Sequence, residues 1–99
     1  MNISKKLDGH NLTIALEGRL DTMTAPELES ALHPGMDDAE SLVLDLKDLH
    51  GISSAGLRVL LAAYKYMNKQ GYMIVRNVNP EIMDIFRENG FLDILTIEN

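Results

Sequence analysis

The chain has 99 residues, a formal net charge of −6 and no cysteine, and 45% of its residues are hydrophobic. This length fits one domain over residues 1–99 with a single core. The acidic balance argues against binding to nucleic acid, and the lack of cysteine excludes disulfides and thiolate metal sites. Without an apolar run that could span a bilayer or form a signal peptide, we expect a cytoplasmic protein with no direct membrane insertion.

Hydrophobic periodicity and turn residues predict alternating strands and helices after an N-terminal hairpin. In chain order we expect strands at Asn2–Leu7 and Leu12–Glu17, a loop at Gly18–Met23, a helix at Ala25–Leu32, a solvated acidic connection at Met36–Glu40, a strand at Ser41–Leu46, a helix at Ser54–Gln70, a strand at Tyr72–Val75, a helix at Pro80–Asn89 and a short strand within Phe91–Ile97.

Capping residues mark the ends of the three predicted helices. Thr24 and Glu27 have the spacing of a capping box before the first helix. We expect Gly71 to end the second helix in a left-handed conformation, Asn79 to cap the third, and Gly90 to end it.

The order of these elements predicts an α/β fold. The near-continuous apolar run of Ser41–Leu46 indicates a strand that is buried on both faces, as in parallel sheets. Right-handed crossovers between successive parallel strands would place the helices on one face. We therefore expect a mixed, mostly parallel sheet of four to five strands with helices mainly on one face.

Two adjacent serines, Ser53 and Ser54, lie between the central strand and the second helix. A helix N-terminus presents unpaired N–H groups and partial positive charge, and serine is a preferred N-cap there. One serine is enough for a cap, and the small Ala55 and Gly56 leave the turn uncrowded. The turn is therefore both a capping structure and a candidate site. Asp21 follows the second strand and is expected at the same sheet edge.

The segment from Gly51 to Ala55 is close to a nucleophile elbow, which raises the possibility of a hydrolase. That class needs a histidine after the serine, but His10, His33 and His50 all precede it. The histidines also lack the spacing of metal ligands. We therefore predict a binding module rather than an enzyme, without metal or cofactor.

The predicted core stripe of the second helix consists of apolar residues at helical spacing: Leu57, Leu60, Leu61, Tyr64 and Met67. Four other residues of this helix, Arg58, Ala62, Lys65 and Lys69, recur at similar spacing on another face. A solvated helix face and a docking surface are both compatible with this pattern. As a docking surface, it would offer positive charge to a partner beside the serine turn.

The motif Ile52-Ser53-Ser54-Ala55-Gly56-Leu57, between a strand and an apolar helix, resembles the signature of the STAS family, which includes the bacterial anti-sigma factor antagonists. Two further blocks, Gly18-Arg19-Leu20-Asp21 with Thr24-Ala25-Pro26-Glu27-Leu28, and Gly90-Phe91-Leu92, resemble family segments in the same order. Alignment on Gly56-Leu57 places Ser54 at the serine that the family phosphorylates. Ser53 then occupies a position where the family usually has Asp.

The resemblance implies partner switching: the dephosphorylated form binds an anti-sigma factor that is a serine kinase, phosphorylation releases it, and a phosphatase resets it. Ser54 would be the phosphorylated residue, with Ser53 as the alternative. The expected partner surface comprises Asp21, Thr22, Ser53, Ser54, Gly56, Arg58, Ala62 and Lys65. The alternative function is a STAS scaffold subunit of a transport or signalling assembly that is not phosphorylated.

Overall fold

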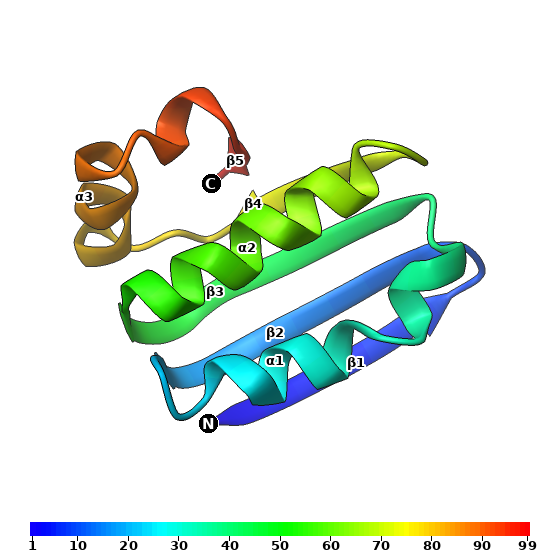
Figure 1. The fold of residues 1–99 in the computed structure, drawn as a ribbon, viewed down its shortest axis with the longest axis horizontal. Coiled ribbons are helices and arrows are strands. Elements are labelled where there is room, and N and C mark those ends of the chain that lie inside the picture. Colours follow the sequence, from blue (N-terminus) through cyan, green and yellow to red (C-terminus); the bar gives the residue numbers. More distant parts are fainter.

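A computed structural model describes all of residues 1–99 and contains a five-stranded sheet with three α-helices (Figure 1). The elements are β1 (Asn2–Asp8), β2 (Asn11–Leu20), α1 (Ala25–Leu32), β3 (Ser41–Ile52), α2 (Ser54–Met67), β4 (Tyr72–Arg76), α3 (Pro80–Glu88) and β5 (Thr96–Glu98), with short 3₁₀ turns at Gly35–Asp38 and Phe91–Asp93. The strands lie in chain order; β1 and β2 are antiparallel, and all other neighbours are parallel. The predicted α/β fold with its N-terminal hairpin is confirmed.

Helices α1 and α2 run side by side over one face of the sheet, and α3 packs against β3 near the end where β3 and β4 finish (Figure 1). Along β3, Leu44 is fully buried whereas Val43 and Asp45 face the other side and are only partly buried. The prediction that Ser41–Leu46 is buried on both faces is therefore wrong. On the open face, Val43 of β3 pairs with Ile74 of β4, which is also partly buried. This apolar pair accounts for an apolar residue at position 43 although that face is not fully buried.

The core lies between the sheet and the helices. Its fully buried large side chains are Leu12, Ile14, Leu16, Leu20, Leu28, Leu42, Leu44, Leu46, Leu49, Leu60, Met67 and Phe86. In α2 the predicted stripe is right for Leu57, Leu60 and Met67, but Leu61 and Tyr64 are only partly buried. The buried residues of α2 are Gly56, Leu57, Val59, Leu60, Ala63 and Met67, whereas Arg58, Ala62 and Lys65 are exposed.

Strand β2 is longer than predicted because it continues through Gly18 to Leu20. Its register against β3 shifts twice along its length. Gly18 has a φ of +113°, which only glycine adopts readily, and bulges let a strand continue past such a residue. The prediction of a loop over Gly18–Met23 is therefore wrong in its first three residues, and the β2–α1 loop consists of Asp21–Thr24.

Helix α1 begins at Ala25 as predicted, but Thr24 and Glu27 do not form a capping box. Thr24 makes no side-chain cap to the helix. Its hydroxyl instead donates to the carbonyl of Arg19 at 2.7 Å. The carbonyl of Asp21 accepts from the N–H of Ala25 at 2.8 Å, and its carboxylate accepts from the N–H of Thr24 at 3.1 Å. Asp21, rather than the side chain of Thr24, therefore accepts hydrogen bonds from N–H groups at the start of α1.

The predicted left-handed cap at Gly71 is also wrong. Helix α2 ends at Met67 rather than Gln70, and Gly71 is not among the residues with positive φ. A Cβ on Gly71 would collide with the backbone carbonyl of Glu40. Glycine is therefore needed there because two backbone segments approach closely where β4 begins beside β3.

The third helix follows the prediction closely. The side chain of Asn79 accepts a hydrogen bond from the N–H of Ile82 at 3.0 Å, and Gly90 adopts a φ of +75° after the helix. Ile82 and Phe86 are fully buried, whereas Ile85 is partly buried. No helix of the structure combines the length and the apolar character that crossing a membrane requires.

Candidate functional site

The serine turn is held at the edge of the sheet where β2 and β3 end. Ser53 occupies the N-cap position of α2 with extended backbone (φ −97°, ψ 176°). Its N–H donates to the carbonyl of Leu20 at 2.8 Å, and its carbonyl accepts from the N–H of Leu57 at 2.9 Å. The first of these bonds ties the serine turn to the end of β2, immediately before Asp21. The prediction that Asp21 and the serines share one sheet edge is confirmed.

The two serines have different environments. The Oγ atom of Ser53 is buried and has no hydrogen-bond partner, and the side chain makes no cap to α2. Ser54 is exposed at the first position of the helix. Only the hydroxyl of Ser54 is therefore directly accessible to another protein, while the position of Ser53 is set by its backbone bonds.

Gly56 lies beneath the serine turn, in a buried position. A Cβ at Gly56 would lie 2.7 Å from Cγ of Leu20 and 2.9 Å from Cγ1 of Ile52. The absence of a side chain thus lets the first turn of α2 rest directly on the ends of β2 and β3. This residue positions the turn from below and contributes no surface to it.

The β2–α1 loop beside the turn is fastened by its own side chains. Oδ1 of Asp21 accepts from the N–H groups of Met23 at 2.9 Å and Thr24 at 3.1 Å. The N–H of Asp21 in turn donates to the hydroxyl of Thr24 at 2.9 Å. The pKa of Asp21 is lowered, chiefly by the hydrogen bond from the N–H of Thr24 and further by that from Met23. Thr22 is exposed in this loop.

A groove runs along the seam between α1 and α2, starting beside the serine turn. It comprises a hollow of about 550 Å³ and a smaller one of about 210 Å³ that share Glu29, Val59 and Ala62. The larger hollow is lined by Thr22, Ala25, Pro26, Glu29, Ala55, Arg58, Val59, Leu61, Ala62 and Lys65. Arg58, Ala62 and Lys65 are all exposed, so the structure brings three predicted contact residues to one wall of one groove.

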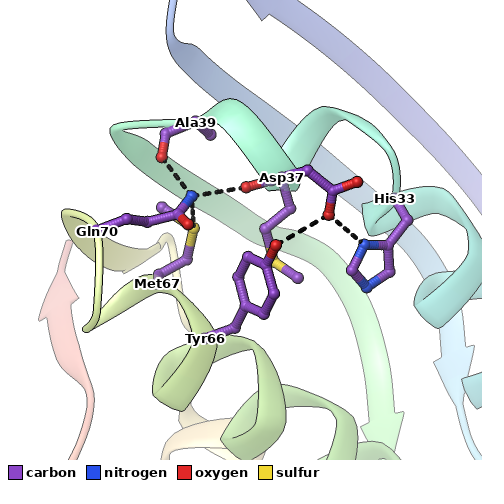
Figure 2. A network of polar contacts seen from close by, with 7 residues as sticks. His33, Asp37, Ala39, Tyr66, Met67 and Gln70 are labelled. Carbon is purple, nitrogen blue, oxygen red and sulfur yellow. Dashed lines mark hydrogen bonds and ion pairs between the residues drawn. The ribbon is translucent and has the colours of Figure 1, made fainter.

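The far end of this groove is closed by polar contacts between α1, α2 and the 3₁₀ turn (Figure 2). Oδ1 of Asp37 lies 2.9 Å from Nδ1 of His33 and accepts from the hydroxyl of Tyr66 at 3.0 Å. These bonds lower the pKa of Asp37, with His33 as the larger cause, and the bond to Asp37 raises the pKa of Tyr66. The network fixes the far end of α2 relative to α1.

Gln70 adds a second fastening at the same place (Figure 2). Its Nε2 donates to the carbonyls of Met36 at 2.8 Å and Ala39 at 2.7 Å. Met36 and Ala39 are buried, so the prediction of a solvated connection over Met36–Glu40 is wrong for these two residues. Their backbone carbonyls face Gln70, which follows the end of α2, whereas the acidic residues Asp37, Asp38 and Glu40 are exposed.

Two of the three histidines, His10 and His33, make their side-chain contacts with the 3₁₀ turn Gly35–Asp38, and His50 is exposed near the end of β3. His33 contacts Asp37 and Tyr66, and His10 contacts the backbone of Asp38. No three histidine, aspartate or glutamate side chains gather in the manner of a metal site. What the structure brings together at the serine turn is therefore a surface with an accessible hydroxyl, a fastened loop and a charged groove.

Sequence reasoning missed two residues of this surface, Met23 and Glu29. Met23 is 82% exposed in the β2–α1 loop, and Glu29 of α1 lines the same groove as Arg58 and Lys65 of α2. The position of Met23 between Asp21 and Thr24, two residues typical of turns, was the available signal for an exposed apolar side chain. Nothing in the local pattern indicated that α1 would place Glu29 in the groove.

Residues 2–99 match the family described as STAS domain. The chain is 38% identical to BtrV of Bordetella bronchiseptica, which carries the name of an anti-sigma factor antagonist, over 95% of this chain and 82% of that protein. It is 28% identical to the anti-sigma-B factor antagonist of Bacillus subtilis, over 98% of this chain and 90% of that protein.

Solved structures share the fold. An anti-sigma factor antagonist from Mycobacterium paratuberculosis superposes with a TM-score of 0.87 at 24% identity, covering 97% of this chain and 83% of that one. The Bacillus cell fate determinant SpoIIAA in its phosphorylated form superposes with a TM-score of 0.77 at 15% identity, covering 99% and 92%. The family match over residues 2–99, the 38% identity to BtrV and the shared fold agree, and the chain belongs to the STAS domain family.

Proposed function

We propose that this protein is an anti-sigma factor antagonist that works by partner switching. In its dephosphorylated form it binds an anti-sigma factor that is also a serine kinase, and phosphorylation of Ser54 releases it. The names of its relatives support the antagonist role. A serine phosphatase would return it to the binding form. The protein itself is a regulator and supplies no catalytic group.

The contrast between the two serines is the observation that carries the assignment of Ser54. The exposed hydroxyl of Ser54 can reach a kinase active site without rearrangement, whereas Oγ of Ser53 is buried. Ser54 is also the first residue of a 14-residue helix, where a phosphate is favoured by free N–H groups and by the helix dipole. The free protein therefore tolerates the phosphorylated state.

The complex with the anti-sigma factor would be destabilised by a phosphate on Ser54. Phosphorylation replaces a neutral hydroxyl by about −1.5 to −2 charges. An interface that closes over Ser54 would bury this charge without a partner, which costs several kcal/mol. Release then follows from the difference between the exposed, capped phosphate in the free protein and the desolvated phosphate in the complex.

The binding surface in this proposal is the serine turn together with the groove between α1 and α2. Arg58 and Lys65 give positive charge to one wall of that groove in a protein whose net charge is −6. Such a local reversal of charge steers an acidic partner surface to this side of the molecule. The exposed Ala62 between them leaves room for a side chain of the partner.

The experiment begins with capture of partners from the native host and identification by mass spectrometry. The purified kinase and ATP are then incubated with wild-type protein, Ser54→Ala and Ser53→Ala, and the phosphate is mapped. We expect label on Ser54 in the wild type and in Ser53→Ala, and none in Ser54→Ala. Phosphate on Ser53 alone would overturn the assignment.

Titration of the same kinase tests the switch. Ser54→Ala should bind like the wild type and resist release by ATP, whereas Ser54→Asp should bind roughly ten- to a hundredfold more weakly, since each 1.4 kcal/mol is tenfold. Ser53→Asp is the matched control for an added charge one residue away. If neither serine is labelled and Ser54→Asp binds like the wild type, the protein is a scaffold subunit, a role favoured by Ser53 in place of the family's usual Asp.

A further inference from the structure

Met23 is the most exposed large apolar residue of the chain. Its exposed fraction is 82%, compared with 57% for Tyr72, 55% for Leu7 and 38% for Leu92. Single apolar side chains on a protein surface are common, so exposure alone does not indicate a function. The construction of the loop beneath Met23 provides the second observation.

The backbone on both sides of Met23 is held by hydrogen bonds. The carboxylate of Asp21 accepts from the N–H of Met23 at 2.9 Å and from that of Thr24 at 3.1 Å. The hydroxyl of Thr24 accepts from the N–H of Asp21 and donates to the carbonyl of Arg19 at 2.7 Å. This tight turn fixes the backbone of Met23, and so the direction of its Cα–Cβ bond, before any partner arrives. A loop whose backbone is already ordered loses less entropy on binding.

The same turn is joined to the serine turn. Leu20, which precedes Asp21, accepts the hydrogen bond from the N–H of Ser53 at 2.8 Å. Thr22, which precedes Met23, lines the groove together with Arg58. Met23 therefore follows directly on a residue that lines the groove of the proposed binding surface, in a loop whose first end is bonded to the serine turn.

We propose that Met23 is a hydrophobic anchor of this interface, and that its side chain enters an apolar pocket on the anti-sigma factor. This proposal rests on the proposed function. An unbranched, polarisable thioether adapts to pockets of irregular shape, which suits an anchor on a loop. Buried anchors at the centre of an interface carry most of the binding energy, whereas the charged groove wall governs orientation and association rate.

Three variants test the anchor against the purified anti-sigma factor identified by the capture experiment. Met23→Ala should weaken binding by about ten- to a hundredfold, mainly through faster dissociation. Met23→Leu retains the apolar volume and should bind within a few-fold of the wild type. Leu7→Ala removes another exposed apolar side chain, on β1, and should not change the affinity. Unfolding midpoints equal to the wild type exclude a folding defect in each variant.

A spectroscopic measurement reports on the side chain directly. The six methionine methyl groups are labelled with ¹³C, and the Met23 signal is assigned from its absence in Met23→Leu. Addition of the anti-sigma factor should shift this signal strongly, as expected for a methyl group that enters a pocket. If the anti-sigma factor binds but Met23→Ala binds equally well and the methyl signal does not move, the anchor is wrong and the proposed function stands. If the wild type binds no anti-sigma factor, both fail.

Discussion

Gly56 in the first turn of α2 packs directly against the side chain of Leu20 at the end of β2. A Cβ on Gly56 would approach Cγ of Leu20 to 2.7 Å, and Leu20 is itself fully buried. Leu20 also provides the carbonyl that holds Ser53. The close packing of the first turn of α2 on Leu20, which brings the serine turn next to the sheet, therefore requires glycine at position 56.

Gly56→Ala should lower the free energy of unfolding by about 1–2 kcal/mol. Overpacking of a filled core costs about 1–3 kcal/mol, and the better helix propensity of alanine returns up to about 1 kcal/mol. Gly51→Ala is the control, because its Cβ would meet only the flexible end of Arg19, at 3.2 Å. Denaturant titration compares the two variants, and an equal effect would contradict the special role of Gly56.

Ser53→Ala should leave the free energy of unfolding unchanged or raise it by up to about 1 kcal/mol. Its hydroxyl is buried without a partner, and removal of such a group relieves a desolvation penalty. Asn79→Ala is the opposite case, because the Asn79 side chain caps α3 by accepting from the N–H of Ile82. Its loss should lower the free energy of unfolding by about 1 kcal/mol or more. Loss of stability in Ser53→Ala similar to that in Asn79→Ala would show that Ser53 caps α2 in solution.

Charge reversal in the groove should weaken partner binding without unfolding the protein. Arg58→Glu and Lys65→Glu change exposed residues of the groove wall, so we expect less than about 0.5 kcal/mol in stability but a clear fall in association rate. Lys6→Glu makes the same charge change on the exposed edge strand β1 and serves as the control. Stopped-flow mixing with the anti-sigma factor at two salt concentrations gives the rates; equal rates for all three variants would place the interface elsewhere.

Acid should loosen the β2–α1 loop before it unfolds the protein. Hydrogen bonds from Thr24 and Met23 lower the pKa of Asp21 below its ordinary value of 3.8. The stability that the ionised Asp21 contributes is therefore complete above its ordinary value and is lost as the pH falls through the lower, folded pKa. Carboxyl and amide NMR shifts of Asp21, Met23 and Thr24 should titrate together. Amide shifts that do not follow the Asp21 carboxyl would show that its charge does not hold the loop.

Much of the fold could be predicted from local patterns. The alternation of Leu12, Ile14 and Leu16 indicated a strand with one buried face, and the Asn79-Pro80 pair predicted the start of α3. These features depend only on residues that are close in sequence, and the folded chain shows the alternating burial and the helix cap that those residues predict. The serine turn was predictable for the same reason, because a strand followed by small residues and an apolar helix constrains the connection.

The errors arose where distant contacts decide the outcome. Thr24 has the spacing of a capping residue, but Arg19 and Asp21 compete for its hydroxyl once β2 reaches Leu20. The glycine at position 71 is explained by the backbone of Glu40, thirty-one residues earlier in the chain. In the candidate site, the burial of the Ser53 hydroxyl and the place of Glu29 in the groove likewise follow from how β3, α1 and α2 meet, which no local pattern encodes.

The direction of the strands also identifies a position at which the protein can be attached to a surface or labelled at a single site. The serine turn and the β2–α1 loop lie where β2 and β3 end, and the β1–β2 turn lies at the other end of β2, about 30 Å away at about 3.3 Å per residue for its ten residues. Asp8, the last residue of β1 before this turn, is exposed, and the chain has no natural cysteine. An Asp8→Cys variant can therefore be coupled through a single thiol to a sensor surface or a fluorophore, with every molecule presenting its serine turn outward.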